Sequence, residues 1–449
     1  MDQRSLVHDA PAAVADPRPH VLIIGGGFGG LAAAQGLRRA PVRITVVDKS
    51  NHHLFQPLLY QVATASLAPS DIAEPIRSIL RRQDNAAVRL AEVTEIDLAG
   101  KRAHLIEEDG DREWIHWDKL VVAAGASHGY FGHDDWSEHA PGLKTLGDAL
   151  EIRRKILYAF ERAEWTTDPA LRTALTTFVV IGGGPTGVEL AGSLAEIAFW
   201  TLRRDFRNIM TTRARVVLVE AGHGLLNGYP PDLQEKAKSQ LEKIGVEVRF
   251  GAAVTGVDAH GIVLGADRID AGTVLWAAGV RGAGVAKSLG VTLDKAGRVP
   301  VQPDCSIPGH PDAFVIGDLA LFVPEPGGKP LPGVAQVAMQ GGAHVATTIA
   351  HDLERSPRTP FVYNDKGSMA TIGRSKAVAD LGWMKASGFV AWFLWAFVHV
   401  LFLVTFRSRL LVMTKWAWAW FTYERAVRLI WTLPEEQRAI SRRRPESAA

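Results

Sequence analysis

A glycine-rich unit that occurs twice constrains the fold of this chain more than any other feature. In the first copy an apolar, β-type segment leads into Gly25-Gly-Gly27-Phe-Gly-Gly30, and a helical stretch follows. In such a unit Gly25 permits a tight turn, Gly27 lets the backbone approach a pyrophosphate, and Gly30 permits close packing of helix on sheet. The helix N-terminus offers free N–H groups to the phosphates. The next β-type segment ends at Asp48, whose carboxylate is placed to bind the ribose hydroxyls of an adenosine.

The second copy lies in the middle of the chain. An apolar segment again leads into Gly182-Gly-Gly184-Pro-Thr-Gly187, a helix follows, and Glu220 ends the next β-type segment. One Gly-x-Gly-x-x-Gly sequence is a weak signal, because glycine-rich turns also occur for purely structural reasons. Two copies, each with a strand before, a helix after and an acid ending the next strand, indicate two dinucleotide sites. The acid comes later in the second copy, which predicts an insertion around residues 199–208.

Three further segments fit a fold with two dinucleotides. Gly125 and Gly279 end matching apolar segments that return the chain from each nucleotide domain, and Gly317-Asp318 follow a third. Similarity to two-dinucleotide flavoproteins implies that Asp318 bonds the ribityl chain of the flavin; the alternative is an Asp that caps the next helix. We predict an α/β fold with two Rossmann-type dinucleotide-binding domains, like that of glutathione reductase, which hold FAD permanently and NADH transiently, followed by a C-terminal membrane-associating helical region. The predicted domains are a disordered N-terminus (1–19), an FAD-binding domain in two parts (20–143 and 295–365), an NADH-binding domain (144–294) and the C-terminal region (366–449).

The charge balance and the cysteine content exclude several classes of function. The chain has 449 residues with 50 Lys and Arg against 48 Asp and Glu, a near-even balance that argues against a nucleic-acid protein. Its one cysteine, Cys305, cannot form an intramolecular disulfide, a dithiol redox centre or a thiolate zinc cluster. Redox chemistry must therefore come from bound cofactors, and electrons cannot leave a flavin through a dithiol.

The residues around Glu220 predict which nicotinamide cofactor is used. The three residues that follow the acid, Ala221-Gly222-His223, include no arginine that could bind a 2′-phosphate. A carboxylate in this place repels that phosphate, and we expect NADH to be preferred over NADPH. Arg213 and Arg215, which precede the strand, are the residues that could reverse the preference.

Five segments carry a resemblance to a known family. They are residues 52–61, 182–192, 331–340, 365–373 and 388–392. The first, His52-His-Leu-Phe-Gln-Pro-Leu-Leu-Tyr-Gln61, has no cysteine, unlike the disulfide reductases of this fold. The chain resembles the type II NADH:quinone oxidoreductases, which are single-subunit, non-pumping dehydrogenases. The resemblance implies that a quinone accepts the electrons, that Ala335-Gln336-Val-Ala-Met-Gln340 lines the quinone site, and that Ala335 also contacts a cofactor.

Three side chains are candidates for catalysis. Gln336 and Gln340 are four residues apart on an expected helix, so both neutral amides can face a quinone carbonyl. The alternative is that both are ordinary helix surface. Glu189 lies in the first helical turn after Gly187 and either positions nicotinamide, passes a proton towards reduced quinone, or merely stabilises the helix N-terminus.

Other polar side chains in these segments are weaker candidates. His52 and His53 do not indicate a metal site, because adjacent side chains face different ways and no Cys or carboxylate lies at ligand spacing. Lys366 and Lys376 are candidates for contact with the flavin or for closing the quinone entrance. The weaker candidates are Tyr60, Gln61, Lys366 and Lys376.

The C-terminal region differs in composition from the rest of the chain. From residue 366 onwards it carries 13 Lys and Arg against five Asp and Glu, and seven of the 13 tryptophans lie between residues 383 and 431. Residues 388–406 have no formal charge, but tryptophans in their body and charges in the next stretch argue against a membrane span. We expect helices that lie in the membrane interface; the alternative is a core helix pair or a dimer contact. The cations expected to meet anionic head groups are Arg407, Arg409, Lys415 and Arg425.

These observations together predict FAD-dependent oxidation of NADH with two-electron transfer to a membrane quinone, without proton pumping. The resemblance implies a homodimer on the cytoplasmic face of a bacterial inner membrane, with the quinone pool and the bilayer surface as partners and no nucleic acid. Two alternatives remain open. A soluble reductase of a ferredoxin or rubredoxin leaves the Trp-rich region unexplained, and an NADH-sensing flavoprotein would lack a fast acceptor.

Overall fold

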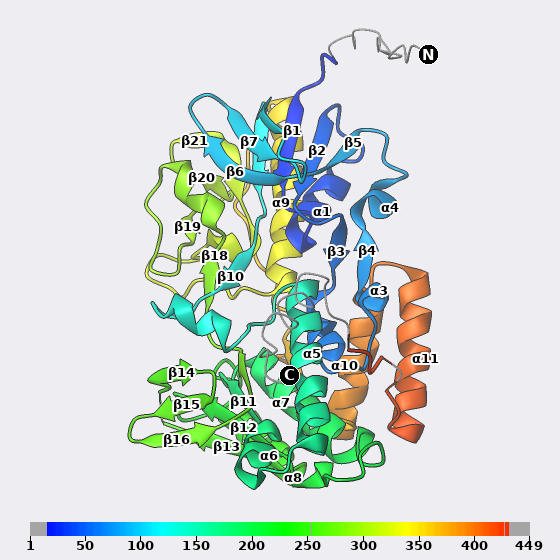
Figure 1. Cartoon of the computed structure of the whole chain (residues 1–449). Helices are drawn as coiled ribbons and strands as arrows, with labels where there is room; N and C mark the ends of the chain where they lie inside the picture. Colours follow the sequence, from blue (N-terminus) through cyan, green and yellow to red (C-terminus); the bar gives the residue numbers. More distant parts are fainter. Residues whose placement is uncertain (1–15, 252, 426, 431–449) are drawn as a thin grey trace, which may run out of the picture. The chain divides into compact units, whose positions relative to one another are not determined.

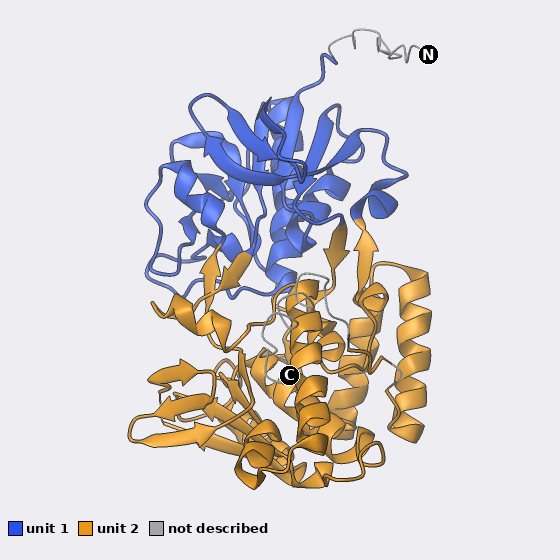
Figure 2. Ribbon diagram, in the orientation of Figure 1, with its two compact units in different colours: residues 1–51, 76–125, 283–363 blue, residues 52–75, 126–282, 364–449 orange. Residues whose placement is uncertain are grey.

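The computed structural model describes residues 16–251, 253–425 and 427–430 (Figure 1). The chain forms two compact units, each assembled from three stretches of sequence (Figure 2). Unit 1 comprises residues 1–51, 76–125 and 283–363, and unit 2 comprises residues 52–75, 126–282 and 364–449. Most of the predicted disordered N-terminus and the last part of the C-terminal region, with its run of arginines, lie outside the described residues.

Within the described residues, the centre of unit 1 is a six-stranded sheet in which only the edge strand β20 runs antiparallel to its neighbour. Its middle strand β1 is buried along its whole length, because both faces of the sheet are covered. Side chains alternate along β1, so Val21 and Ile23 point to one face and Leu22 and Ile24 to the other. In sheet order the strands are β20 (Ser306–Ile307), β21 (His310–Val315), β9 (Lys119–Val122), β1 (His20–Ile24), β2 (Arg43–Asp48) and β5 (Ala86–Leu90).

Two layers cover this sheet. Helices α1 (Phe28–Gly36) and α9 (Ala335–Glu354) pack on the face that carries Val21 and Ile23, and Figure 1 shows the two helices side by side. A three-stranded antiparallel sheet covers the other face: β6 (Glu92–Asp97), β7 (Arg102–Ile106) and β8 (Arg112–His116). The shorter elements of unit 1 are α4 (Ile76–Leu80), the 3₁₀ helices η5 (Gly284–Leu289) and η6 (Gly317–Leu319), and the paired strands β19 (Val299–Pro300) and β22 (Ala320–Leu321).

Unit 2 repeats the same plan around a four-stranded parallel sheet. In sheet order its strands are β13 (Val246–Phe250), β12 (Arg215–Glu220), β11 (Thr177–Ile181) and β17 (Thr273–Trp276). An antiparallel sheet packs against it through a shared apolar core and consists of β14 (Gly256–Asp258), β15 (Gly261–Leu264) and β16 (Asp267–Asp270). The accompanying helices are α5 (Leu146–Trp165), α6 (Pro169–Leu175), α7 (Pro185–Glu196) and α8 (Pro231–Lys243).

The C-terminal part of the chain also belongs to unit 2. An antiparallel sheet of β23 (Ser368–Gly373), β24 (Lys376–Asp380) and β25 (Lys385–Ser387) leads into α10 (Phe389–Phe402) and α11 (Phe406–Thr422). Helix α10 packs on β24 through small side chains, Ala391 against Ala377 and Ala379. Neither these helices nor any other in the described part of the chain is long and apolar enough to cross a membrane.

Several short elements complete unit 2. The hairpin strands β3 (His52–Leu54) and β4 (Ala73–Pro75) enclose η1 (Gln56–Leu58), α2 (Leu59–Ala63) and α3 (Pro69–Ile72). The strands β10 (Ala126–His128) and β18 (Val280–Gly282) pair antiparallel. The remaining turns are η2 (Asp134–Glu138), the π-helical turn η3 (Ile197–Thr201) and η4 (Thr211–Arg213).

The predicted α/β class, with two Rossmann-type sheets and a C-terminal helical region, is confirmed. The compact units divide the chain differently from the predicted domains, at residues 125 and 282 rather than 143 and 294. The reason is that β10 and β18 pair with each other and so group with unit 2. Residues 52–75 also group with unit 2, because α2 contacts α5 and α7.

Candidate functional site

The first glycine turn, in unit 1, has the geometry that a dinucleotide requires. Gly25 lies at φ +101°, and a Cβ on Gly30 would stand 1.8 Å from the carbonyl oxygen of Gly25, so neither position accepts a side chain. Gly27, the residue before α1, has no heavy atom within 4 Å of a Cβ placed on it. This open space in front of a helix N-terminus without a side-chain cap can receive a pyrophosphate.

Asp48, at the end of β2, is held in place by the backbone. Its Oδ2 accepts a hydrogen bond from the N–H of Gly26 at 2.6 Å, and its Oδ1 accepts one from Ser50 at 2.7 Å. Each carboxylate oxygen keeps a further lone pair, which the two ribose hydroxyls of an adenosine can use. The turn and the acid together fit the adenosine diphosphate half of FAD.

The second turn, in unit 2, has the same geometry as the first. Gly182 lies at φ +111°, and a Cβ on Gly187 would stand 1.8 Å from the carbonyl oxygen of Gly182. Gly184, like Gly27, faces open space at the start of its helix. Glu220 accepts hydrogen bonds from the N–H groups of Gly183 at 2.6 Å and Gly222 at 2.7 Å, which leaves lone pairs for a second ribose. This side chain is one methylene longer than Asp48 but makes the same two contacts.

The strands next to each turn end in further glycines with positive φ. Gly125 follows β9 at φ +69°, and Gly279 follows β17 at φ +76°. In unit 1 a third such glycine, Gly317, lies at φ +68° after β21, and a Cβ on it would stand 3.2 Å from the Cβ of Ala338 on α9. The carboxyl ends of the parallel strands, where ligands of such sheets bind, are therefore free of side chains at these positions.

Helix α9 brings the predicted glutamines to this end of unit 1. It starts at Ala335, and Gln336 and Gln340 lie on the same face of its first two turns. The helix approaches α1 closely, since a Cβ on Gly29 would stand 3.1 Å from the carbonyl oxygen of Ala338. Asp318 lies beside the segment that leads into α9, with its Oδ1 3.1 Å from a Cβ placed on Gly333.

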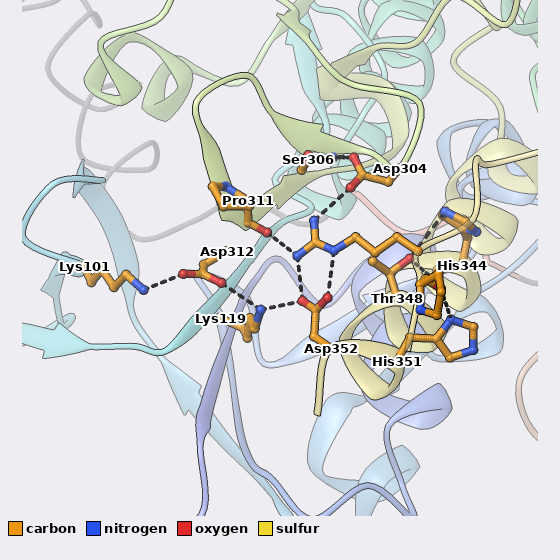
Figure 3. A network of polar contacts seen from close by, with 12 residues as sticks. Lys101, Lys119, Asp304, Ser306, Pro311, Asp312, His344, Thr348, His351 and Asp352 are labelled. Carbon is orange, nitrogen blue, oxygen red and sulfur yellow. Dashed lines mark hydrogen bonds and ion pairs between the residues drawn. The ribbon is translucent and has the colours of Figure 1, made fainter. Parts of the chain in front are cut away.

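Ion pairs fix the far end of α9 (Figure 3). Asp352, in its last turn, pairs with Lys119 at the start of β9 and with Arg358 beyond the helix. Lys119 also contacts Asp312 of β21 at 2.7 Å, and Arg358 contacts Asp304 at 2.8 Å. The network joins the C-terminal end of α9 to two strands of the sheet.

Unit 2 contains a cavity, partly open to solvent, which we call the aromatic cavity. Residues from four parts of unit 2 line it, and tryptophans form much of its wall. The lining residues are Tyr60, Gln61 and Ser66; Glu189, Ser193, Glu196 and Thr201; Thr371, Ile372, Gly373 and Arg374; and Trp392, Trp395, Lys415, Trp416, Ala419, Trp420, Tyr423 and Arg425.

Glu189 and Tyr60 give this cavity two protonated groups near neutral pH. Burial raises the pKa of the Glu189 carboxyl to about 8, although a backbone hydrogen bond from Thr371 opposes the shift. Burial and the negative charge of Glu189 raise the pKa of the Tyr60 hydroxyl well above its ordinary value. Both groups can therefore donate a hydrogen bond at pH 7.

The polar contacts of Tyr60 reach α11. The indole Nε1–H of Trp416 donates to Oε1 of Gln61 at 2.7 Å, and the Gln61 amide donates to the Tyr60 hydroxyl oxygen at 2.9 Å. Trp395 of α10 stacks on Trp416, with ring centroids 5.2 Å apart. The sequence indicated Tyr60 and Gln61 only as weak candidates, and the structure places both in the wall of the cavity.

The expectation that Arg425 meets lipid head groups is wrong. Arg425 is only 7% exposed, and its guanidinium donates to Glu196 at 2.9 Å and to the carbonyl oxygen of Thr64 at 2.8 Å. Burial lowers the pKa of Arg425, and the charge of Glu196 opposes that shift. The chain turns back towards α7 after α11, which carries this cation inwards.

The same expectation is wrong for Lys415. Its ammonium contacts both carboxylate oxygens of the buried Asp71, at 2.6 and 2.8 Å, because this face of α11 lies against α3. Arg407 is exposed, and Arg409 donates to the carbonyl oxygen of Leu403 at 2.9 Å. Neither of the weaker candidates Lys366 and Lys376 lines the aromatic cavity.

Helical spacing was the signal that could have found the missed lining residues. Ser193 and Glu196 follow Glu189 by four and seven residues on α7, and Trp420 follows Trp416 by four on α11. Glu220 lies further from its glycine turn than Asp48 does, because α7 continues into the π-helical turn η3 before the chain reaches β12. No group of three or more His, Cys, Asp or Glu side chains within the described ranges is arranged to hold a metal ion.

The chain matches two protein families in succession. Residues 19–342 match the family described as pyridine nucleotide-disulphide oxidoreductase, and residues 366–423 match the NDH2 C-terminal domain. A solved structure described as NDH2 from Plasmodium falciparum in complex with NADH superposes with a TM-score of 0.84 at 19% identity, covering 92% of this chain and 100% of that chain. At this identity the superposition shows a shared fold.

Curated relatives match almost the whole chain. A protein of Mycobacterium tuberculosis named type II NADH:quinone oxidoreductase Ndh is 45% identical, over 98% of this chain and 95% of its own length. A mitochondrial protein of Arabidopsis thaliana, named internal alternative NAD(P)H-ubiquinone oxidoreductase A1, is 31% identical, over 89% of this chain and 83% of its own length.

Proposed function

The chain belongs to the type II NADH:quinone oxidoreductases, flavoproteins that oxidise NADH and reduce a quinone, and we propose that its two units divide this reaction. Unit 1 holds FAD through Gly25, Gly27, Gly30 and Asp48, and unit 2 receives NADH at the second turn with Glu220. When bound, FAD supplies the group that accepts two electrons from NADH, because no amino-acid side chain accepts a hydride. In sum, NADH and one proton convert the quinone to quinol and leave NAD⁺. The named relatives support this reading over a ferredoxin-type reductase or a sensor.

The remaining dinucleotide contacts follow the same division. Gly125, Gly317 and Asp318, which follow strands of unit 1, and Ala335, which begins α9, belong to the FAD site; Gly279, which follows β17, belongs to the NADH site. Each turn directs free N–H groups at the start of a helix towards a pyrophosphate, and each acid binds a ribose. Because Glu220 would repel a 2′-phosphate, unit 2 prefers NADH to NADPH.

We further propose that quinone reaches the reaction through the aromatic cavity. The observation that carries this proposal is that tryptophans of α10 and α11 and the protonatable groups Glu189 and Tyr60 line one cavity. A flat, uncharged ring with two carbonyl groups fits a wall of indoles that also carries hydrogen-bond donors. Independently of the cavity, we propose from the family resemblance that the neutral amides of Gln336 and Gln340 contact quinone carbonyls.

Filling the cavity tests this route. Ala419 of α11 lines it, and Ala419→Trp should lower kcat/KM for a short-chain quinone at least about tenfold, a loss of roughly 1.4 kcal/mol, while NADH still bleaches the flavin at the normal rate. Ala417→Trp, on the exposed side of the same helix, is the matched control and should retain quinone turnover. Equal quinone turnover in the two variants would contradict the route.

The outer faces of α10 and α11 support docking on a lipid surface. Phe389, Phe393 and Phe397 recur every four residues on α10 and are 55 to 58% exposed, and Phe406 and Phe421 of α11 are 78 and 75% exposed. Large exposed aromatic side chains of this kind are typical of helices that lie in a membrane interface. We propose that the enzyme binds peripherally, with α10 and α11 against the bilayer.

Vesicle binding tests the docking face. Phe393→Ser with Phe397→Ser should lower partitioning into anionic phospholipid vesicles about tenfold or more, because two exposed aromatic rings lose their burial in lipid. Trp165→Ser is the matched control, since Trp165 is 81% exposed at the end of α5. Unchanged partitioning of the double variant would contradict this face.

The family membership also supports a homodimer on the cytoplasmic face of a bacterial inner membrane, where it feeds a respiratory chain. Light scattering of the purified enzyme in detergent tests the first point, since a dimer has twice the 48.7 kDa mass of the chain. Inside-out and right-side-out vesicles test the second, because NADH is charged and does not cross a membrane. Oxidation of NADH only by inside-out vesicles is the expected result; a monomer, or activity in intact right-side-out vesicles, would contradict the respective point.

A further inference from the structure

We propose that Trp416 is a positioning residue: it fixes the direction of the Gln61 and Tyr60 hydrogen bonds, so that the Tyr60 hydroxyl presents its hydrogen to a quinone carbonyl in the aromatic cavity. This inference rests on the proposed function, in which quinone enters that cavity. It adds a hydrogen-bond donor for the quinone within unit 2, and it gives helix α11 a part in orienting that donor.

The direction of the hydrogen bonds follows from the chemistry of the indole. The Trp416 Nε1 carries a hydrogen and has no free lone pair, so it can only donate. The Gln61 atom that lies 2.7 Å from it must be the amide oxygen. The amide nitrogen of Gln61 then points the other way and lies 2.9 Å from the Tyr60 hydroxyl oxygen. An amide nitrogen also only donates, and the Tyr60 oxygen is therefore the acceptor of this bond.

A hydroxyl oxygen that accepts keeps its own hydrogen available. Within residues 16–251, 253–425 and 427–430 the Tyr60 hydroxyl makes no hydrogen bond other than the one from Gln61. Tyr60 and Gln61 are 6 and 7% exposed, and both side chains line the aromatic cavity. Because Gln61 occupies the hydroxyl's acceptor side, the hydrogen is left for an acceptor that enters the cavity.

The Tyr60 hydroxyl also keeps its hydrogen across the working pH range. Burial and the nearby Glu189 charge both disfavour the phenolate and raise the pKa of Tyr60. A quinone carbonyl oxygen is a neutral acceptor, and it gains negative charge as the ring is reduced. A preorganised donor therefore binds the carbonyl oxygen more strongly as negative charge develops on it during reduction. Such preferential binding can raise the rate of quinone reduction.

The surroundings hold the Trp416 indole in this orientation. Trp395 stacks on its ring with an interplanar angle of 29°, and Lys415, the preceding residue, pairs with Asp71. Trp416 is thus held on both its ring face and its backbone, and Gln61 lies 355 positions away in the sequence. The contact connects α11, whose outer face we assign to the membrane, with α2.

The test measures the affinity for menadione, a quinone without a tail, by equilibrium dialysis against the oxidised holoenzyme. Trp416→Phe keeps the ring and removes only the N–H, and Tyr60→Phe removes only the hydroxyl. Each should raise the Kd for menadione about three- to tenfold, the range for one neutral hydrogen bond. The double variant should be no weaker than Tyr60→Phe alone, because Trp416 then has no donor to orient. Gln61→Met should show the same non-additivity if Trp416→Phe fails to bind flavin.

Trp420 provides the matched comparison. It lies one turn further along α11, lines the same cavity, and donates its Nε1–H to the Ser375 hydroxyl at 3.1 Å instead of to Gln61. The effect of Trp420→Phe on the Kd, whatever its size, should add to that of Tyr60→Phe. Flavin content and Tm of each variant report whether the fold is retained.

Two results would overturn the inference. One is additivity of Trp416→Phe and Tyr60→Phe, because independent effects exclude action of one residue through the other. The other is an unchanged Kd in Tyr60→Phe while Ala419→Trp still blocks quinone turnover, which would leave the route through the cavity intact. Failure of Ala419→Trp to slow quinone turnover would instead contradict the proposed function itself.

Discussion

In unit 1 the helix after the glycine turn is crossed by another helix, α9, whereas in unit 2 the corresponding helix α7 is crossed by strand β23. Gly36 of α1 meets α9 so closely that a Cβ would stand 2.6 Å from the Cβ of Ala346. Gly192 of α7 meets β23 more closely still, with a Cβ position 1.8 Å from the carbonyl oxygen of Ile372. The turns themselves, with their acids Asp48 and Glu220, have the same contacts.

We infer from this contrast that the glycine turn and the crossing element have separate tasks. The turn, which we assign to a pyrophosphate and a ribose, is nearly identical in the two units. The crossing element brings the side chains that differ: α9 carries Gln336 and Gln340 in unit 1, while Thr371 of β23 contacts Glu189 in unit 2. Equivalent substitutions in the two turns should therefore affect different steps of the reaction.

The largest effect is expected from the paired substitutions Gly30→Ala and Gly187→Ala. In both, the new Cβ would stand 1.8 Å from a backbone carbonyl oxygen, so the turn must deform. We expect Gly30→Ala to lose bound flavin, and Gly187→Ala to keep flavin but bind NADH about 100-fold more weakly, a loss of about 2.8 kcal/mol. Flavin absorbance per chain and the NADH concentration that half-bleaches it measure the two effects.

Glycines in open space serve as controls for that pair. A Cβ on Gly284 of unit 1 or on Gly228 of unit 2 meets nothing within 4 Å, and alanine in either place should change neither flavin content nor NADH affinity. If Gly187→Ala loses flavin as completely as Gly30→Ala, the division of the two dinucleotides between the units is wrong.

Gln336→Ala tests the crossing helix of unit 1. It should lower quinone turnover about tenfold through loss of a hydrogen bond to the reacting carbonyl, while NADH reduces the flavin within about twofold of the normal rate. Stopped-flow measurement of the two half-reactions separates these steps. Equal loss in both half-reactions would exclude the quinone role of Gln336.

The two acids give a smaller and more selective contrast. Glu220→Ala should reduce the preference for NADH over NADPH about fivefold, because the repulsion of the 2′-phosphate is removed. Asp48→Ala is the counterpart in unit 1 and should weaken FAD retention without changing that preference. The ratio of kcat/KM for the two nucleotides is the measurement, and a ratio that Asp48→Ala shifts as much as Glu220→Ala would contradict the assignment.

The smallest effect concerns pH and Glu189. The folded pKa is about 8 against an ordinary 4.5, so the folded protein binds this proton more tightly than the unfolded chain between those values. The contribution to stability is complete below pH 4.5 and is lost as pH rises through about 8. Relative to Glu189→Gln, wild-type Tm should fall by about 1–2 °C per pH unit in this window and then level off. Parallel Tm curves of the two proteins between pH 5 and 9 would refute the shift.

The sequence predicted the two turns well, because their function depends on local spacing. Gly25, Gly182 and the acids that follow lie where a strand, a tight turn and a helix must place them. The α/β class follows from the same repetition, and the expected quinone chemistry agrees with the named relatives. The roles of the individual site residues stay predictions.

The sequence failed where a side chain depends on a distant partner. We predicted that Arg425 and Lys415 face lipid. Instead, Arg425 pairs with Glu196 and Lys415 pairs with Asp71, each more than 200 residues away in the sequence. A basic, apolar helix does not reveal which face packs inwards. The contact of Trp416 with Gln61 is hidden for the same reason.

An anaerobic flavin titration tests whether NADH bound by unit 2 reduces a flavin held by unit 1 and whether a quinone then reoxidises that flavin. The holoenzyme is mixed anaerobically with NADH, and separately with NADPH, while the absorbance of oxidised flavin is followed; a short-chain quinone is then added. We expect rapid bleaching by NADH, slower bleaching by NADPH, and prompt recovery on addition of quinone. Bleaching without recovery would contradict quinone as the acceptor, and no bleaching by NADH would contradict the assignment of the second glycine turn.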